Sequence, residues 1–364
     1  MTVSTVPTPY LPDTGALGMR KVMPAPGQTL IDLSLNESSW GASPAAIAAA
    51  RDRAAMMSRY PDPMSATLRD AIGAHYGIDL EQIICGNGSE ELLDVIARCY
   101  ARPGDEVLIP QWGFAQFAVV AMRVGATIVK APEAADYVTD VDALVAAITD
   151  RTRVIFLANP NNPTGTILPN AEVARLVEAV PPHIVLVLDS AYAEYPEDAA
   201  YTDGMAYVAG RDNVIVTRTF SKGYGLAALR VGWAYGPAAM IRVMNKVRGV
   251  GNVNALAQEA ALAALADQSF LDTVRQETTA QRLRLEAGLK RLGLAPLPGT
   301  CNFLLIGFPT DTNHTAAAAK AFLFDRGIVV NHTAPYGLDQ FLRCSVGLPA
   351  EVDAVLAALG EFMV

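Results

Sequence analysis

The stretch TFSKGYGLAALR at Thr219–Arg230 decides the fold and carries the most specific chemical pattern in the sequence. It directly follows VIVTR at Val214–Arg218, a short β-branched run typical of a buried strand in a parallel sheet. Burial at the end of such a strand lowers the pKa of a lysine amine. A neutral amine is available for Schiff-base chemistry, so Lys222 is the candidate for that role.

Groups that can hold a phosphate accompany this lysine. Thr219 and Ser221 supply two hydroxyls, and Arg230 supplies a fixed cation. A lone lysine after a strand is more often an ordinary surface residue. Because three flanking groups stand beside it here, after several other motifs in a fixed order, the combination is hard to obtain by accident.

The first of those other motifs is GNGSE at Gly86–Glu90. It follows a predicted strand at Gln82–Cys85 and precedes a predicted helix at Glu90–Arg102, and free N–H groups at a helix N-terminus bind anions. A tight strand-to-helix connection without a ligand remains a plain alternative. The pattern is neither G-x-G-x-x-G nor a P-loop, which argues against classical dinucleotide and nucleoside-triphosphate sites.

Two further motifs, NPNNPTG at Asn159–Gly165 and DSAY at Asp189–Tyr192, also end predicted strands. Those strands are Val154–Ala158 and Ile184–Leu188, and ligands of open α/β sheets bind at the carboxyl ends of strands. Prolines and a glycine fix an unusual turn that can aim an asparagine into the crevice. A structural turn for the first motif and a helix cap for Asp189 remain open.

Strands alternate with helices up to about residue 245, which predicts an α/β fold. Beyond it, Asn254–Leu292 has the composition of one or two long helices, followed by a smaller α+β unit. We expect an N-terminal arm at 1–35 that packs on the small domain, a large domain at 36–245 and a small domain at 246–364. Further strands are predicted at Val107–Pro110, Ala126–Lys130, Val231–Tyr235, Asn302–Gly307, Gly327–Val330 and Phe341–Val346, and further helices at Ala171–Ala179 and Ala316–Arg326.

The bulk composition points to a well-packed globule. The 364 residues are 51% hydrophobic and 18% charged, and the net charge of −9 disfavours nucleic acid and anionic membranes as partners. Met1–Leu30 shows no secretory signal, so we expect a cytoplasmic protein. The four cysteines form no C-x-x-C pair and the four histidines have no metal-ligand spacing, so no metal is expected.

Taken together, the motifs resemble those of the aspartate aminotransferase superfamily, the fold type I enzymes that use pyridoxal phosphate (PLP). Within it, the chain is most similar to histidinol-phosphate aminotransferases, from about Tyr10 to the C-terminus. The likeness includes Leu35–Glu37 (LNE), Arg59–Pro63 (RYPDP) and Leu342–Gly347 (LRCSVG). It implies a large domain with a mostly parallel sheet between helices, a smaller α+β domain, and a homodimer with shared active sites.

The resemblance also implies a role for each residue of the cofactor site. Lys222 carries PLP as a Schiff base and shuttles a proton. Asp189 pairs with the pyridine nitrogen. Asn162 and Tyr192 bond to the 3′ oxygen. The remaining cofactor residues are Gly88, Ser89, Glu90, Thr219, Ser221 and Arg230 around the phosphate, Tyr60 reaching it from the neighbouring subunit, and Trp112 stacked on the ring.

For the substrate, the resemblance implies that Arg343 clamps a carboxylate as a bidentate pair, with Asn36, Tyr10 and Asn331 nearby. The family usually has an arginine where Asn331 stands, and that arginine helps bind the substrate phosphate. Loss of such a cation weakens dianion binding by roughly 1–3 kcal/mol. Trp40 also adds a bulky aromatic on the substrate side.

Four functions follow as hypotheses. The first is transamination of histidinol phosphate with 2-oxoglutarate, and the second is an aromatic or broad-specificity aminotransferase. A phosphothreonine decarboxylase-like enzyme is less well supported, because Thr219–Arg230 resembles the aminotransferase branch. A PLP-binding regulator is disfavoured, since no helix-turn-helix or basic arm precedes the domain.

Overall fold

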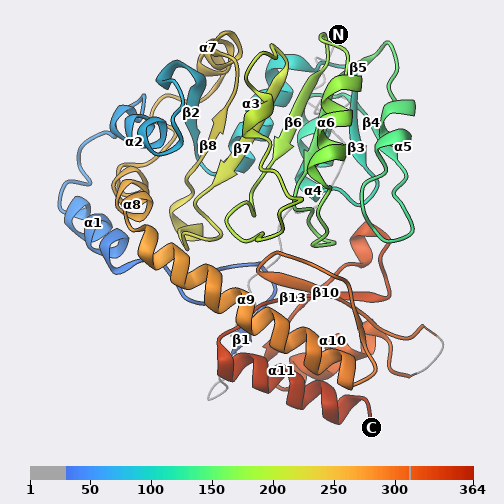
Figure 1. Ribbon diagram of the computed structural model, residues 1–364. Coiled ribbons are helices and arrows are strands. Elements are labelled where there is room, and N and C mark those ends of the chain that lie inside the picture. The colour runs from blue at the N-terminus through green and yellow to red at the C-terminus, as the bar shows by residue number, and fades with distance from the viewer. Residues whose placement is uncertain (1–29, 311–312) are drawn as a thin grey trace, which may run out of the picture.

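The computed structural model describes residues 30–310 and 313–364. Figure 1 shows a large α/β layer above and a smaller layer below, in which a long helix runs across two short strands. The large layer holds a seven-stranded sheet in the order β2-β8-β7-β6-β5-β3-β4. Its strands are β2 (Ile83–Gly86), β3 (Glu106–Pro110), β4 (Thr127–Ala131), β5 (Thr152–Ala158), β6 (Val185–Asp189), β7 (Val214–Thr219) and β8 (Gly232–Tyr235).

The five strands from β7 to β4 are mutually parallel, while β8 runs antiparallel to both β2 and β7. Alternate residues of the strands enter two separate cores, because successive side chains of a strand point to opposite faces. In β5, Val154 and Phe156 pack on one face and Ile155 and Leu157 on the other. Both faces are buried, which explains the near-continuous apolar runs of the sequence.

Helices cover both faces of this sheet. One face packs against α3 (Ser89–Tyr100), α4 (Ala115–Arg123) and α7 (Ala238–Val247). The other packs against α1 (Pro44–Ala54), α2 (Ala66–Tyr76), α5 (Val141–Ala146), α6 (Asn170–Ala179) and α8 (Ala255–Ala266). Short 3-10 turns lie at Leu80–Gln82, Met205–Tyr207, Ala227–Leu229 and Ala334–Tyr336. The expected α/β fold with a mostly parallel sheet between helices is confirmed.

The smaller layer is a four-stranded antiparallel sheet in the order β12-β13-β10-β9. The strands are β9 (Ala295–Pro296), β10 (Phe303–Gly307), β12 (Asn331–His332) and β13 (Phe341–Ser345). Helices α9 (Gln268–Arg291), α10 (Ala316–Asp325) and α11 (Pro349–Phe362) share its apolar core. A separate pair joins β1 (Ile31–Asp32) in parallel to β11 (Ile328–Val329), so residues near the start of the described chain lie against this layer.

Asn254–Leu292, predicted as one or two long helices, is two helices in the structure, and the strand predicted at Gly327–Val330 is shorter there, at β11. Asn254–Leu292 forms two helices because Asp267 caps α9, its side chain accepting a hydrogen bond from the Phe270 N–H. Gly327–Val330 does not continue as one strand through Asn331. The chain instead changes partner at Val330, from β1 to β13, which puts Asn331 directly opposite Arg343.

Across the described residues, no helix has the length and apolar character needed to cross a membrane.

Candidate active site

The motifs singled out in the sequence meet at the carboxyl edge of the large sheet. Asp189 is the last residue of β6 and Thr219 the last of β7, and these strands are parallel neighbours. Lys222 follows β7 by three residues, and Asn162 lies in the loop after β5. Because parallel strands end at the same edge, residues distant in sequence become neighbours there.

Lys222 is half-buried and held by backbone. Its Nζ donates to the carbonyl oxygens of Leu35 at 3.2 Å and Asn36 at 3.0 Å, and it lies 5.7 Å from the centre of the Tyr192 ring. Burial, followed by the positive charge of Arg343, lowers the pKa of Lys222 to about 7. A substantial fraction of this amine is therefore neutral near physiological pH, as a Schiff-base nucleophile requires.

Asp189, at the end of the neighbouring strand, and Tyr192, near the lysine, are both buried. Asp189 Oδ1 accepts a hydrogen bond of 2.8 Å from the Thr217 hydroxyl. Burial raises the pKa of Asp189 to about 6, and the bond from Thr217 opposes that shift. Tyr192 accepts a bond of 2.9 Å from Asn36 Nδ2, and burial raises its phenol pKa. Because burial disfavours the ionised form of Asp189, a nearby cation would stabilise that form strongly.

Arg343 links the small sheet to the loop after β5 and to the segment that follows β1. It projects from β13, and its Nη1 donates to Asn162 Oδ1 at 2.5 Å while its Nη2 donates to the Ser34 carbonyl at 2.8 Å. Its guanidinium lies 5.6 Å from the Phe303 ring. The Nε atom is buried with no hydrogen-bond partner among the described residues. A guanidinium group whose Nε–H is available as a further donor is suited to binding an anionic ligand.

The start of α3 forms an anion cradle. Gly88 caps the helix with a φ of 81°, and the next residues are Ser89 and Glu90. A Cβ atom on Gly88 would lie 2.7 Å from Arg230 Nη2, so glycine lets the cation approach the helix end. Arg230 Nη1 donates to Ser221 Oγ at 3.4 Å. Helix N–H groups, a hydroxyl and a guanidinium thus converge on one place.

The PLP expected from the sequence fits these residues. Its phosphate matches the cradle between Gly88 and Arg230, and its aldehyde needs an amine with the lowered pKa of Lys222. Its ring nitrogen, when protonated, is the cation that buried Asp189 lacks.

Comparison with known proteins agrees with this geometry. The family described as aminotransferase class I and II matches residues 28–359. The chain belongs to this family. A histidinol-phosphate aminotransferase of Rhodopseudomonas palustris (strain HaA2) is 44% identical over 355 residues, covering 98% of this chain and 95% of the relative. One from Rhodospirillum centenum is 45% identical over 340 residues, covering 93% of each chain.

Solved structures of similar proteins have the same fold as this aminotransferase. Histidinol-phosphate aminotransferase from Sinorhizobium meliloti, in complex with pyridoxal-5'-phosphate, superposes with a TM-score of 0.86 at 32% identity, covering 92% of this chain and 91% of that one. L-threonine-O-3-phosphate decarboxylase from Porphyromonas gingivalis superposes at 0.80 with 23% identity, covering 92% and 99%, and this likeness shows the fold alone. The resemblance stated from the motifs is confirmed.

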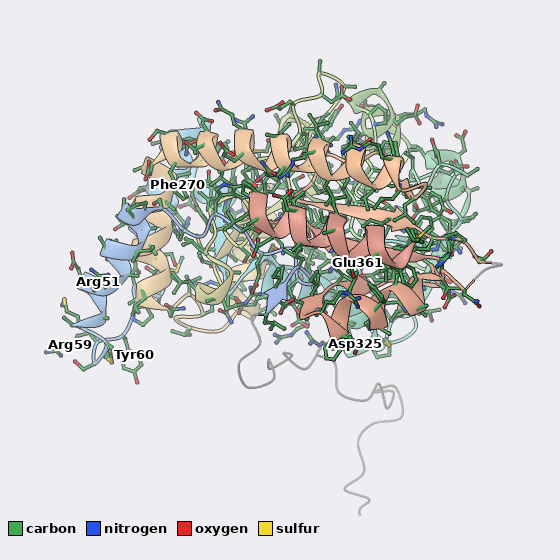
Figure 2. All side chains as sticks on the ribbon, turned by 90° about the horizontal axis from the view of Figure 1, so that it is seen from below. Arg51, Arg59, Tyr60, Phe270, Asp325 and Glu361 are labelled. Atoms are coloured by element: carbon green, nitrogen blue, oxygen red, sulfur yellow. The ribbon has the colours of Figure 1, made fainter. Side chains whose placement is uncertain are left out.

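The other site residues predicted from the sequence of this aminotransferase do not all lie with this cluster. Trp112 is half-buried, with its ring 5.0 Å from that of Tyr137. Tyr60 is 98% exposed, and Figure 2 shows it pointing into solvent at a projecting corner beside Arg59. Within this chain it does not join the site. Asn36 is buried and touches Tyr192, whereas Tyr10 lies outside the described residues.

Two residues at the site were not predicted. Asn302 Nδ2 donates to the carbonyls of Asn36 at 3.1 Å and Glu37 at 3.2 Å. Glu133 accepts a 2.9 Å bond from the Trp112 N–H. Asn302 begins a predicted strand and Glu133 follows one, and an asparagine or glutamate there carries no signal of its own in a single sequence.

Proposed function

We propose that this aminotransferase uses PLP to transfer the amino group of histidinol phosphate to 2-oxoglutarate. The main support for the proposal is Lys222 at the carboxyl edge of the sheet, where burial and the guanidinium of Arg343 lower its pKa to about 7 and Leu35 and Asn36 hold its amine. The similarity over nearly the whole chain to proteins named histidinol-phosphate aminotransferases supports the substrate.

In this proposal the cofactor is held at three points. Gly88, Ser89 and Glu90 offer backbone N–H groups to the phosphate. Asp189 binds the ring nitrogen and Lys222 binds the aldehyde carbon. The other phosphate and ring contacts are assigned to Thr219, Ser221, Arg230, Asn162, Tyr192 and Trp112.

The protein's own groups then perform the proton chemistry. When bound, PLP supplies a ring that withdraws electrons from the carbon being deprotonated. Once the substrate amine had replaced Lys222 at the aldehyde carbon, the freed neutral amine of Lys222 would take the proton from the substrate carbon and return it on the cofactor side. Asp189 stays ionised while it faces a cationic ring nitrogen, because an opposite charge lowers a carboxyl pKa.

Arg343 provides the anchor for both substrates. Glutamate and 2-oxoglutarate present an α-carboxylate to the guanidinium fork. Histidinol phosphate has no carboxylate, and its phosphate ester sits on the carbon next to the amine-bearing carbon. The same fork can therefore bind that phosphate, with the Asn162 bond fixing its orientation.

An aromatic amino acid is the second candidate substrate, and Asn331 favours it. This neutral residue lies opposite Arg343 in the register of β12 and β13. The rings of Trp112, Tyr137 and Phe341 pack together, with centroid separations of 5.0 and 5.2 Å. An apolar wall with one cation suits a monoanionic aromatic acid better than a dianion.

Steady-state assays with purified protein separate the two candidates. For the first, histidinol phosphate with 2-oxoglutarate should give the highest kcat/KM among the amino donors tested. A far larger kcat/KM for phenylalanine or tyrosine would rule out histidinol phosphate as the native substrate. Release of CO2 from phosphothreonine without an oxo acid would instead indicate the decarboxylase.

We further propose that the protein is a cytoplasmic homodimer. Each subunit would consist of an N-terminal arm at residues 1–35, a large domain at 36–245 and a small domain at 246–364. Tyr60 would then act in the neighbouring subunit's site, for which its exposure leaves it free. Exposed Met56 and Met57 lie in the same segment and support burial against a partner. The four cysteines are unpaired within the described chain, as in a reducing compartment.

A further inference from the structure

Four consecutive carbonyl groups at Ser34–Glu37 receive hydrogen bonds from side chains far away in sequence. Arg343 donates to the Ser34 carbonyl, and Lys222 to those of Leu35 and Asn36. Asn302 donates to the carbonyls of Asn36 and Glu37. This segment is thus a row of backbone acceptors lying against the reactive amine.

Asn36 gives the segment its shape. Its φ is 55°, in the left-handed region that asparagine tolerates better than most residues. The Asn36 N–H donates to Ser345 Oγ at 2.9 Å, and its side chain donates to the Tyr192 hydroxyl. The residue is 1% exposed. In this turn two successive carbonyls, of Leu35 and Asn36, face the same side and reach one nitrogen.

We propose that the Leu35–Asn36 turn is the resting site of the Lys222 ammonium whenever that nitrogen is not bound to the cofactor. Asn36 and Asn302 are its positioning residues, acting through backbone carbonyls. The inference rests on the proposed function for the role of Lys222, and it goes beyond it by assigning a place for the released amine.

The charges around Lys222 explain why such a site is needed. Arg343 and Arg230 disfavour its protonated form, Glu37 favours it, and burial is the largest single cause of the lowered pKa. Carbonyl oxygens carry partial negative charge without being able to take the proton. They hold an ammonium next to two guanidinium groups and release it when the proton leaves. The amine then alternates between the cofactor and this turn.

The test compares three variants of the full-length protein. Asn36→Gly removes the side chain but keeps the left-handed φ accessible. Asn36→Val removes the same contacts and disfavours that φ, because valine is β-branched. Asn302→Ala leaves Asn36 intact and removes the donors that hold its carbonyl. Circular dichroism and thermal unfolding identify which variants fold.

The measurement is the pH midpoint at which an amine-directed reagent modifies Lys222 in cofactor-free protein, followed by peptide mass spectrometry. Lys246 and Lys290 in the same samples serve as internal standards. Displacement of the Leu35 and Asn36 carbonyls from the amine removes their stabilisation of the ammonium. We therefore expect the Lys222 midpoint to fall by about one pH unit in Asn36→Val and in Asn302→Ala, and to stay near the native value in Asn36→Gly.

An unchanged midpoint in folded Asn36→Val overturns the inference, as does an equal fall in Asn36→Gly and Asn36→Val, which would implicate the Asn36 side chain and not the turn. If Asn36→Val does not fold, Asn302→Ala decides alone, and an unchanged midpoint there overturns the inference. Protection of Lys222 by added PLP is scored separately. Absence of that protection contradicts the proposed function, whereas the midpoints in cofactor-free protein test the turn.

Discussion

Lys222 and Asp189 form a pair of groups whose pKa values burial moves in opposite directions. Burial lowers the lysine pKa to about 7 and raises the aspartate pKa to about 6. Each shift disfavours the charged form. Both groups therefore titrate close to neutral pH in the cofactor-free protein, and perturbed pKa values of this kind are typical of functional sites.

Replacement of Asp189 by asparagine should stabilise the cofactor-free protein and lower the activity of the loaded enzyme. A folded pKa above the unfolded value means that the folded state binds more protons, so the stability of the cofactor-free protein falls as pH rises from about 4 to about 6. The Asp189→Asn variant carries no such cost, because its neutral amide does not titrate and still offers an acceptor to Thr217. As pH rises from 4 to about 8, the free energy of unfolding of the variant should therefore rise by about 1–3 kcal/mol relative to that of the native protein.

The two readouts for this variant are thermal unfolding of the cofactor-free protein across that pH range and kcat of the loaded enzyme. The kcat should fall at least about 100-fold, because the ring nitrogen loses its anionic partner. A pH-independent stability difference would show that Asp189 is not desolvated in the folded state.

Lysine should not be able to replace arginine at position 343. Arg343→Lys keeps the charge but loses the planar fork that bonds Asn162 and the Ser34 carbonyl. We expect kcat/KM for every amino donor to fall by roughly 10- to 100-fold, mainly through KM. The cofactor absorbance should remain unchanged. An equal kcat/KM would remove Arg343 from the substrate site.

Asn331→Arg tests substrate choice. In a site that does not already bind a phosphate dianion, an added cation beside Arg343 should strengthen dianion binding by about 1–3 kcal/mol, which is roughly 5- to 150-fold in kcat/KM. If the native site already serves histidinol phosphate, kcat/KM for that donor should rise by less than about 10-fold. A large gain for histidinol phosphate alone would show that the native site is built for another substrate.

At the scale of elements, the N-terminus of α3 depends on glycine. Gly88→Ala places a methyl 2.7 Å from Arg230 Nη2 and strains a φ of 81°. The matched control is Gly77→Ala at the C-terminus of α2, which has a φ of 68° and open space around its Cβ position. Gly77→Ala, in the left-handed helical region, should lose about 1 kcal/mol of stability. Gly88→Ala should lose about 1–3 kcal/mol, because a φ of 81° with a ψ of 162° suits glycine alone.

Only Gly88→Ala should also lose affinity for PLP, by at least about 10-fold, because its methyl displaces the guanidinium. Absorbance titration with PLP measures that affinity in both variants. Equal affinities would mean that the cradle does not hold the phosphate.

The elements themselves were largely predictable, since buried parallel strands leave apolar runs such as Val154–Ala158 in the sequence. The placement of Lys222 after such a run, beside two hydroxyls, pointed to its neighbours at the sheet edge. The contacts with Leu35 and Asn36 were not predictable, because backbone carbonyls have no residue identity. Asn302 meets Asn36 across 266 residues, and no local pattern encodes that distance.

At the scale of the whole molecule, exposed apolar residues between α1 and α2 predict a dimer. Met57 is 75% exposed and Tyr60 nearly fully so. Met57→Glu should shift the protein to monomer in sedimentation experiments and lower its PLP affinity, because a buried unpaired charge is costly. Leu283→Glu, on the exposed side of α9, is the control and should stay dimeric. A Met57→Glu dimer with native affinity would contradict the proposed interface.

The covalent position of the cofactor tests the whole account most directly. Purified protein loaded with PLP is reduced with borohydride, digested, and its peptides are sequenced by mass spectrometry. We predict one pyridoxyl group, on the Nζ of Lys222, and none in Lys222→Ala. A label on another lysine, or no label on a protein that binds PLP, would contradict this prediction.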